Sequence, residues 1–380
     1  MKRGSQGILI KSSGVGPEKY NTYYPNPLPP KINYSEIKKS LELANRSIGE
    51  LNGVVGLIPD ADVINYLYIR KEAVLSSQIE GTQSTLDDLL KYEASATINV
   101  PIDDVAEVSD YVAAMNHGLK RIQKLPLSLR LIREIHKVLL TNNRGSNKTP
   151  GEFRKSQNWI GGTRPGTAKF VPCSHDKLMS ALSEFEKFMN AADEIPELVR
   201  AALLHHQFET IHPFLDGNGR VGRLLITFYL TTKGFLDFPY LYLSLFFKTH
   251  RQLYYDHLNN VRNDGDWEAW LNFFLEGVAE TAVDAKNNLL KIRHIFQTDR
   301  DMVAGLGRSA KTTLKILEQF RKKPMLKIAE LVEKTGLTRP TTNSGVNRLI
   351  KLGILAPLAE QKWGNTYVYL NYVNALESKE

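Results

Sequence analysis

Residues His205–Arg223, HHQFETIHPFLDGNGRVGR, form the stretch around which the rest of the chain is organised. The twelve residues from His212 to Arg223 hold a histidine, a carboxylate, an amide, three glycines and two arginines. An apolar helical pattern begins near Pro196 and leads into this stretch, and a second one resumes over Arg220–Leu230. We therefore predict two helices joined by a glycine-rich turn at Leu215–Gly219.

This turn suits an anion, and the natural ligand is a phosphate. Glycine tolerates positive φ, so Gly217 and Gly219 free the backbone there. A glycine-rich turn that leads into a helix points several N–H groups outward, where they and the helix dipole favour an anion. Arg220 and Arg223 share a helix face, and their guanidinium groups suit phosphate oxygens. Asp216, at the mouth of the loop, suits Mg²⁺ carried by a nucleotide.

His212 is the titratable base of the stretch. An imidazole with an ordinary pKa near ~6.5 accepts a hydroxyl proton at neutral pH, which suggests a hydroxyl that attacks a bound phosphate. A buried structural network of ion pairs is the first alternative. Zinc is a second, although no HExxH motif or cysteine partner supplies the spacing of zinc ligands. The P-loop pattern GxxxxGK[ST] is absent, so the phosphate site is of another kind.

The motif HPFLDGNGRVGR matches the signature HxFx(D/E)GNGRxxR without a miss, and the chain thereby resembles the Fic (Fic/Doc) family. In that family the motif transfers AMP from ATP to a Ser, Thr or Tyr hydroxyl of a protein. The resemblance implies a protein adenylyltransferase (AMPylator) that uses ATP and Mg²⁺ and modifies target proteins and itself. It implies His212 as the base, Asp216 as the Mg²⁺ ligand and Phe214 as the anchor of the loop. The residues implied to bind ATP are Gly217, Asn218, Gly219, Arg220, Val221, Gly222 and Arg223.

A second family-like element lies upstream, where Ser76–Gly81 ends a predicted helix and fits the pattern (S/T)xxxE(G/N). Alone, this pattern is weak, and a solvated glutamate at a helix end is the alternative. In the Fic family such a helix, N-terminal to the catalytic domain, is autoinhibitory because its glutamate pairs with the second arginine of the motif. The resemblance implies that Ser76, Glu80 and Gly81 inhibit the enzyme through Arg223.

Residues Gly151–Val171 change from helical to extended character. Two short extended runs, around Asn158–Gly161 and Ala168–Val171, flank a Gly/Pro turn and predict a β-hairpin. In the Fic family a hairpin here is the flap that covers the active site and pairs with the target backbone. A purely structural hairpin is the alternative. Arg154 resembles part of the family's GxxR segment, and the implied flap residues are Ile160, Gly161 and Gly162.

Two adjacent tyrosines, Tyr254 and Tyr255, follow the motif within the run RQLYYDHLNNV. The family often places aromatic residues near the adenine at this point, so both are candidate ATP contacts. Packing of at least one of them in the core is an equal alternative.

The C-terminal part carries the positive charge of the chain. Lys286–Trp363 holds 16 Lys or Arg against 6 Asp or Glu, a net +10, whereas the whole chain carries +8. Helix, Thr335-Gly336 turn and helix predict a helix-turn-helix, and a strand at Thr366–Leu370 after the basic loop Gln361–Asn365 makes it resemble a winged helix. The residues predicted to face a groove or backbone of DNA are Thr338, Arg339, Thr341, Thr342, Asn343 and Arg348. Winged helices also serve as protein-interaction or dimerisation modules, so DNA and a homodimer both stay open.

The fold class predicted overall is mainly α, a Fic-fold helical bundle with a β-hairpin flap plus a C-terminal winged helix-turn-helix domain. Tyr20–Pro30, with four prolines, predicts an extended arm over a neighbouring surface. The predicted division is 1–100, N-terminal arm and helical region with the inhibitory helix; 101–297, Fic catalytic domain; 298–307, linker; and 308–380, winged helix.

The composition limits where the protein works. There is no apolar run of about 18 residues and no long apolar segment at the N terminus, so neither a membrane span nor a signal peptide is expected. The single cysteine, Cys173, permits no internal disulfide and fits a reducing compartment. We therefore expect a cytoplasmic protein with no membrane partner.

Three other functions remain open from the sequence. One is de-AMPylation, the removal of AMP from a modified protein, with Glu80 positioning water. Another is transfer of a different nucleotide or phosphate group. The third is a DNA-binding regulator whose Fic domain senses ATP.

Overall fold

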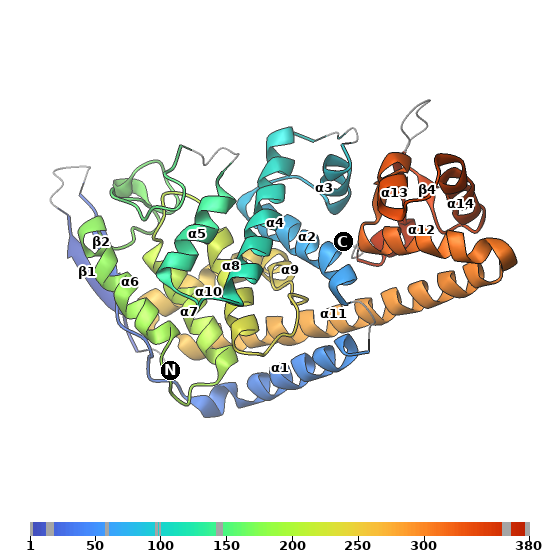
Figure 1. Cartoon of the computed structure of the whole chain (residues 1–380). Helices are drawn as coiled ribbons and strands as arrows, with labels where there is room; N and C mark the ends of the chain where they lie inside the picture. Colours follow the sequence, from blue (N-terminus) through green and yellow to red (C-terminus); the bar gives the residue numbers. More distant parts are fainter. Residues whose placement is uncertain are drawn as a thin grey trace.

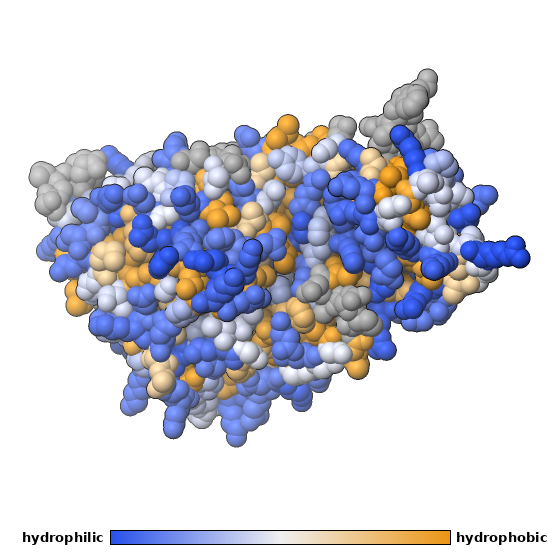
Figure 2. All heavy atoms as spheres, in the orientation of Figure 1, coloured by the Kyte–Doolittle hydropathy of each residue, from blue (hydrophilic) through white to orange (hydrophobic). Residues whose placement is uncertain are grey.

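Two long helices, α1 (Tyr34–Val55) and α11 (Trp267–Ala304), lie side by side along one side of the molecule (Figure 1). The computed structural model describes residues 3–12, 19–57, 61–95, 98, 100–141, 147–358 and 366–376. Within these residues the fold is mainly α, as predicted, and its sheets are small. Hydrophilic residues cover most of the face seen in Figure 2. No helix in the described part of the chain combines the length and apolar character that a membrane crossing requires.

A bundle of helices packs on the α1–α11 pair and surrounds α7 and α8 (Figure 1). Every residue of α7 from Leu198 to Ile211 is buried, and so is every residue of α8 from Arg220 to Leu230. Because both helices are enclosed, their sequences show no amphipathic stripe, and the polar residues among them are buried. The bundle helices are α2 (Ala61–Glu80), α3 (Leu86–Glu93), α4 (Ile102–Ile122), α5 (Leu129–Leu139), α6 (His175–Met189), α7 (Glu197–Ile211), α8 (Asn218–Thr232), α9 (Ser244–Thr249) and α10 (Arg251–Asp264).

The predicted N-terminal arm is extended, as expected, but its first residues form one strand of a hairpin. Strand β1 (Gly7–Lys11) pairs antiparallel with β2 (Asn21–Pro25), with Leu9 opposite Tyr23. The N–H of Tyr23 donates to the carbonyl oxygen of Val171 at 2.9 Å, and its hydroxyl donates to the carbonyl oxygen of Arg262 at 3.1 Å. The arm is therefore joined to the predicted flap segment, Gly151–Val171, and to α10.

The flap segment is more compact than the predicted β-hairpin. Ile160 and Phe170 form a single antiparallel bridge, with Ile160 N donating to Phe170 O at 2.8 Å. A short 3₁₀ turn, Pro165–Thr167, fills the loop between them. The two predicted strands are therefore reduced to one bridge, because Pro165 and two left-handed glycines, Gly161 (φ 69°) and Gly162 (φ 74°), take the chain out of ladder geometry.

The C-terminal residues form the predicted winged helix-turn-helix domain. Helices α12 (Ala310–Lys322), α13 (Ile328–Thr335) and α14 (Arg339–Lys351) pack together, and the sheet order is β3 (Met325–Lys327), β5 (Thr366–Val368), β4 (Ala356–Pro357). Both strand pairs are antiparallel. The last element of the described residues is α15 (Leu370–Asn374), and the predicted basic loop Gln361–Asn365 lies outside those residues.

The predicted linker at 298–307 differs from the structure, because α11 continues through most of it to Ala304. Asp299 and Val303 are buried, and Tyr369 of the winged-helix domain donates a hydrogen bond from its hydroxyl to Asp299 Oδ2 at 2.5 Å. Packing against that domain thus extends the helix beyond the point where its sequence periodicity weakens.

The prediction that Thr342 faces DNA is wrong. Thr342 is fully buried, and its hydroxyl donates to the carbonyl oxygen of Thr338 at 3.0 Å, one turn back in α14. Thr338 caps α14 as predicted, because its side chain accepts from Thr341 N. Arg339 and Asn343 are exposed, and Thr341 and Arg348 are partly exposed.

Candidate active site

The turn between α7 and α8 spans His212 to Gly217, two to three residues earlier than the predicted Leu215–Gly219. His212 and Gly217 adopt left-handed conformations, with φ of 50° and 76°. Gly219 lies inside the first turn of α8, where its φ is not positive, so conformational freedom does not explain it. A side chain there would overlap the carboxylate of Glu80. Glycine is therefore needed at position 219 so that the carboxylate of Glu80 can lie close to the backbone of α8.

The inside of the turn is anchored by Phe214, which is fully buried and stacks on the ring of His136 at 3.7 Å between centroids. Asn218 ties the two ends of the turn together, because its side chain accepts from Phe214 N at 2.8 Å and donates to Phe214 O at 2.9 Å. His136 Nδ1 accepts from Gly151 N at 2.8 Å, so its Nε2 carries the proton that binds the carbonyl oxygen of Asp216 at 3.0 Å. Burial lowers the pKa of His136 to about 4 and keeps it neutral.

The outside of the turn is held by two residues of the flap segment. Arg154 Nε donates to the carbonyl oxygen of His212 at 3.0 Å, and its Nη2 donates to Cys173 O at 2.5 Å. Asn158 Nδ2 donates to the carbonyl oxygens of His212 and Phe214 at 2.9 and 2.8 Å. Sequence reasoning missed Asn158 and His136 as supports. Both are polar residues at buried positions, and a single sequence does not reveal which polar residues are buried.

A pocket of about 300 Å³ opens at the N terminus of α8 and brings together most of the predicted motif residues. Asp216 stands at its edge with 44% of its side chain exposed, and its Oδ1 accepts from Gly217 N at 2.6 Å. No cluster of three His, Cys, Asp or Glu side chains that could hold a metal occurs among the described residues. One exposed carboxylate fits a Mg²⁺ ion held mainly by nucleotide phosphates and water. The pocket is lined by Glu80, Glu107, Leu140, His212, Leu215, Asp216, Gly217, Asn218, Gly219 and Arg220.

Arg220 is already paired with a carboxylate. Its Nη1 lies 2.6 Å from Glu107 Oε1 of α4, and its Nη2 lies 3.8 Å from Asp216 Oδ1. The guanidinium is nearly buried, with 6% of the side chain exposed. Glu107 was not predicted as a site residue, because its position on α4 facing the motif depends on how α4 packs against α8.

Arg223 is held by the end of α2. Its Nε donates to Ser76 Oγ at 2.8 Å, and its Nη2 donates to Ser76 O at 2.9 Å and to Glu80 Oε1 at 2.6 Å. Only 3% of the Arg223 side chain is exposed. Burial opposes the charge of Glu80, but the adjacent guanidinium of Arg223 outweighs it and holds the pKa of Glu80 below its ordinary value. Gly81 follows with a φ of 110°, which ends α2.

His212 lies among charges as well as at a buried position. Burial lowers the pKa of His212 to about 4, and the positive charges of Arg262 and Arg154 add to the effect, whereas a hydrogen bond with the backbone of Glu209 and the carboxylate of Glu80 oppose it. The imidazole is therefore neutral at pH 7 and free to accept a proton.

Of the two candidate adenine contacts, Tyr254 belongs to the core. It is 1% exposed, its hydroxyl lies 2.8 Å from His205 Nε2, and its ring stacks on Phe247. Tyr255 is partly exposed. Burial raises its pKa, and the carboxylate of Glu80 adds to the effect.

The predicted flap residues Gly161 and Gly162 are exposed, and Ile160 is partly exposed. Trp159 beside them has 39% of its surface exposed. The segment thus joins the motif on one side, through Asn158, and faces solvent on the other.

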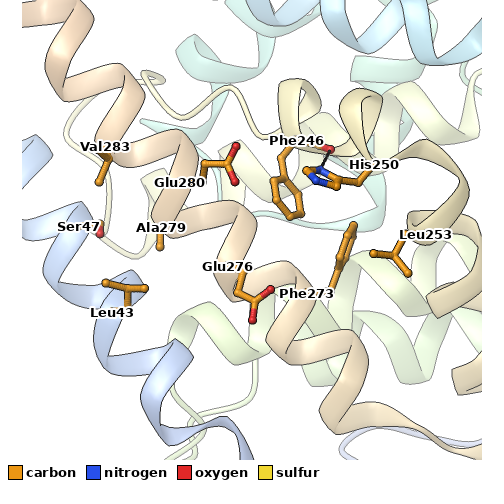
Figure 3. Close-up of a pocket in the computed structure, with 10 residues that line it drawn as sticks. All are labelled: Leu43, Ser47, Phe246, His250, Leu253, Phe273, Glu276, Ala279, Glu280 and Val283. Atoms are coloured by element: carbon orange, nitrogen blue, oxygen red, sulfur yellow. Dashed lines mark hydrogen bonds between the residues drawn. The ribbon is translucent and has the colours of Figure 1, made fainter.

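A second, larger pocket of about 560 Å³ lies away from the motif, between α1, α9, α10 and α11 (Figure 3). It is mostly apolar, and Glu276 and Glu280 of α11 stand at its side. His250 Nδ1 lies 3.1 Å from the carbonyl oxygen of Phe246, one turn back. None of the residues that line this second pocket was predicted to be functional.

Comparisons with known proteins match three parts of the chain. Residues 38–120 match the model described as Fic/DOC family N-terminal, residues 126–230 the model of the Fic/DOC family, and residues 310–356 winged helix-turn-helix DNA-binding. The chain is similar to proteins named protein adenylyltransferase Fic from Drosophila grimshawi and Drosophila virilis, at 30% identity over 186 residues. The match covers 47% of this chain and 35% and 34% of those relatives, about a third of their length.

Solved structures share the fold. A Fic family protein from Desulfovibrio desulfuricans G20 superposes with a TM-score of 0.55 at 20% identity, over 90% of this chain and 98% of that one. A Fic domain containing signaling protein from Bacteroides thetaiotaomicron gives a TM-score of 0.53 at 19% identity, over 65% of this chain and 97% of that one.

Proposed function

We propose that this chain, which carries the two domains of the Fic/DOC family and a C-terminal winged helix-turn-helix domain, is a protein adenylyltransferase. It would transfer AMP from ATP to hydroxyl groups of target proteins and of itself. The similarity to proteins named protein adenylyltransferase Fic supports this reaction class. The observation that carries it is the pocket at the start of α8, where His212, Asp216 and Arg220 meet beside Arg223.

Each residue has a role in that reaction. The hydroxyl oxygen of the target attacks the α-phosphorus of ATP, a new P–O bond forms, and pyrophosphate leaves with the electron pair of the broken bond. His212 takes the hydroxyl proton. Arg220, Arg223 and the N–H groups at the start of α8 neutralise the phosphate oxygens, and Asp216 binds Mg²⁺. When bound, Mg²⁺ lowers the repulsion between phosphates. Preorganised donors of this kind are the expected main source of rate.

Glu80 would hold this enzyme in an inhibited state. The Arg223 guanidinium that a terminal phosphate needs is bound by Glu80 Oε1 at 2.6 Å and by Ser76. One guanidinium fork satisfies one bidentate acceptor well, so the carboxylate and a phosphate compete for it. ATP then binds in a pose that cannot react.

The test is incubation of the purified protein with ATP labelled on the α-phosphate and a protein lysate, followed by mass spectrometry of modified peptides. An added AMP on a Ser, Thr or Tyr is the expected result. Addition of a different nucleotide or phosphate group would assign another transfer reaction. Loss of AMP from a previously modified protein, without transfer, would assign de-AMPylation.

A second function, nucleic acid binding, is favoured by one further observation. A groove of about 490 Å³ in the winged-helix domain lies between α12 and α14 and contains two arginines, Arg308 and Arg348, with the hydroxyls of Thr341 and Ser344. Guanidinium groups beside a helix N terminus suit the phosphates of a DNA backbone. The positive charge of the C-terminal part is consistent with this partner.

Changing Arg308 and Arg348 to Ala tests the groove directly. We expect weaker binding of duplex DNA and a flatter salt dependence, by roughly one unit of slope for each DNA phosphate that an arginine no longer neutralises. Lys351→Ala, also on α14 but outside the groove, is the control. An unchanged slope, or no DNA binding by the intact protein at low salt, would leave the domain as a protein-interaction module.

A further inference from the structure

Glu209 lies one turn before His212 on α7 and faces it. Glu209 Oε2 is 4.0 Å from His212 Nδ1, and 9% of the Glu209 side chain and 19% of the His212 side chain are exposed. Glu209 does not line the phosphate pocket, so it stands behind the imidazole and away from the ligand side.

Each of the two side chains has one buried polar atom that meets no partner with hydrogen-bond geometry within the described part of the chain. Glu209 Oε1 and His212 Nδ1 are buried atoms without a partner among these residues. Leaving a buried polar atom unpaired costs about 1–3 kcal/mol. Because the ring of His212 is partly exposed while its Nδ1 is buried, the part that reaches the pocket lies away from Nδ1 and leaves Nε2 for the substrate.

Gly222 provides the space that Glu209 occupies. A Cβ at position 222 would overlap Glu209 Oε1 and come within 3.2 Å of Phe208 Cδ1. Gly222 lies inside α8 and has no positive φ, so its backbone conformation does not require glycine. The absence of a side chain at Gly222 therefore leaves the space that the buried carboxylate of Glu209 occupies.

The charges around the pair come from four elements. Arg223 of α8, Arg262 of α10 and Glu80 of α2 act on Glu209, and Arg262, Glu80 and Arg154 of the flap segment act on His212. Burial raises the pKa of Glu209 to about 7, and Arg223 opposes that shift. Burial lowers the pKa of His212 to about 4. Below about pH 7 a proton therefore resides on Glu209, and above it the carboxylate is charged beside a neutral imidazole.

We propose that Glu209 is a positioning residue for the base: its carboxylate accepts the Nδ1 proton of His212 and offsets the charge that forms when Nε2 takes the substrate's hydroxyl proton. This inference rests on the proposed AMP transfer. The hydroxyl oxygen forms a bond to the α-phosphorus, pyrophosphate leaves with the electron pair, and the proton passes to Nε2. The imidazolium later releases that proton to water. Glu209 itself forms no bond to substrate.

The kinetic test compares Glu209→Gln with its parent, both carrying Glu80→Gly so that transfer is measurable. At pH 8 the amide lacks the negative charge, so we expect kcat to fall roughly tenfold to a hundredfold, the effect of one charge-assisted hydrogen bond. The KM for ATP should stay the same because Glu209 lies outside the pocket.

The pH profile separates this role from a structural one. In the parent, kcat should rise with pH as Glu209 ionises, at or below about pH 7 because removing Glu80 removes a charge that raises the pKa of Glu209. In Glu209→Gln that rise should disappear, since the pKa of His212, at about 4, keeps the imidazole neutral throughout. An unchanged kcat and profile would overturn the proposal.

Two further variants control for packing. Gly222→Ala should displace the carboxylate and lower kcat, whereas adding Gly222→Ala to Glu209→Ala should lower kcat much less, because the overlap with Glu209 is gone and only the contact with Phe208 remains. Glu197→Gln, at the start of α7, should leave kcat unchanged. An equal loss of kcat in Glu197→Gln would attribute the effect to α7 as a whole and reject the proposed dyad of Glu209 and His212.

A measurement without ATP distinguishes failure of this inference from failure of the proposed function. NMR of ¹⁵N-labelled histidine, with His212 assigned from His212→Ala, should show the Nδ1 signal shifting as Glu209 titrates near pH 7. Glu209→Gln should abolish that shift. A shift in a protein that transfers no AMP would keep the dyad and reject the function. Transfer without the shift would keep the function and reject the dyad.

Discussion

At the residue scale, His212 is held in a backbone conformation that few residues other than glycine adopt. Its φ of 50° is left-handed, and such a position costs about 1–3 kcal/mol unless its surroundings compensate. Arg154 and Asn158 both donate to its carbonyl oxygen. The imidazole is thus fixed at the edge of the pocket by bonds to its own backbone, which suits a base that must meet a hydroxyl.

Removing that base gives the first prediction. A neutral hydroxyl is a poor nucleophile until its proton is removed, so His212→Ala should lower AMP transfer by at least the ~10² typical of removing a general base. ATP binding, measured by calorimetry, should change little. Near-normal modification by this variant would remove His212 from the mechanism.

The Glu80–Arg223 pair, which we propose to be inhibitory, gives the second prediction. Glu80→Gly frees Arg223 for the terminal phosphate, so modification of self and of targets should rise. A charged hydrogen bond worth about 1.5–3 kcal/mol corresponds to roughly one to two orders of magnitude in rate. Incorporation of labelled AMP is compared in wild type, Glu80→Gly and Glu80→Gly with His212→Ala, the last as a blank. Equal incorporation by the first two would mean that the end of α2 serves only packing.

At the scale of elements, α7, the turn and α8 are held in place by three neighbouring elements. The flap segment supplies Arg154 and Asn158, α5 supplies His136, and α2 supplies Ser76 and Glu80. α2 also meets the winged-helix domain, since Tyr372 of α15 donates from its hydroxyl to the carbonyl oxygen of Val63 at 3.2 Å. The helix that ends at Glu80 thus begins against the C-terminal domain.

The flap segment gives the third prediction. Arg154→Ala removes the donor to Cys173 O and one of the two donors to His212 O, the other being Asn158. Urea unfolding should therefore show a loss of at least about 1.5 kcal/mol, and AMP transfer should fall because the turn is no longer fixed. Lys155→Ala, whose side chain is 86% exposed, is the matched control. Equal stability of the two variants would show that Arg154 does not support the turn.

At the scale of the whole molecule, α11 is the common support. It packs along α1, and Tyr369 of the winged-helix domain binds its Asp299. At its other end Arg3 pairs with Glu268 at 2.5 Å, and Asn33 N donates to Glu268 Oε1 at 2.7 Å. The N-terminal arm and the C-terminal domain are therefore joined to one helix.

The Arg3–Glu268 pair gives the fourth prediction. Burial alone raises the pKa of Glu268, but hydrogen bonds from Arg3 and Asn33 outweigh it and lower the pKa to about 2. A depressed carboxyl pKa stabilises the fold above the unfolded value, near ~4.3, and that stability is lost as the pH falls towards about 2. Arg3→Ala should lower the free energy of unfolding by about 1.5 kcal/mol at pH 7.

The difference between Arg3→Ala and wild type should shrink as urea unfolding is repeated below about pH 4.3, where Glu268 becomes protonated in the unfolded chain. Lys286→Ala, which removes a more exposed pair with Glu50, should lower the free energy of unfolding less than Arg3→Ala does. A pH-independent loss in Arg3→Ala would attribute its effect to packing.

The sequence by itself determined the helical class and the winged helix-turn-helix, and it predicted the helix–turn–helix geometry of the His212–Arg223 stretch to within three residues. Local rules suffice there, because apolar periodicity and caps such as Thr338 act over a few residues. Sequence also identified Ser76 and Glu80 through a resemblance, and the structure places both on Arg223.

Only the tertiary structure decided which side chains support that stretch. Glu107 pairs with Arg220, His136 stacks on Phe214, and Glu209 fills the space left by Gly222. The tertiary structure also places Tyr254 in the core and extends α11 through most of the predicted linker. These outcomes depend on which helices pack together, and contacts between residues far apart in sequence leave no periodic signal in a single chain.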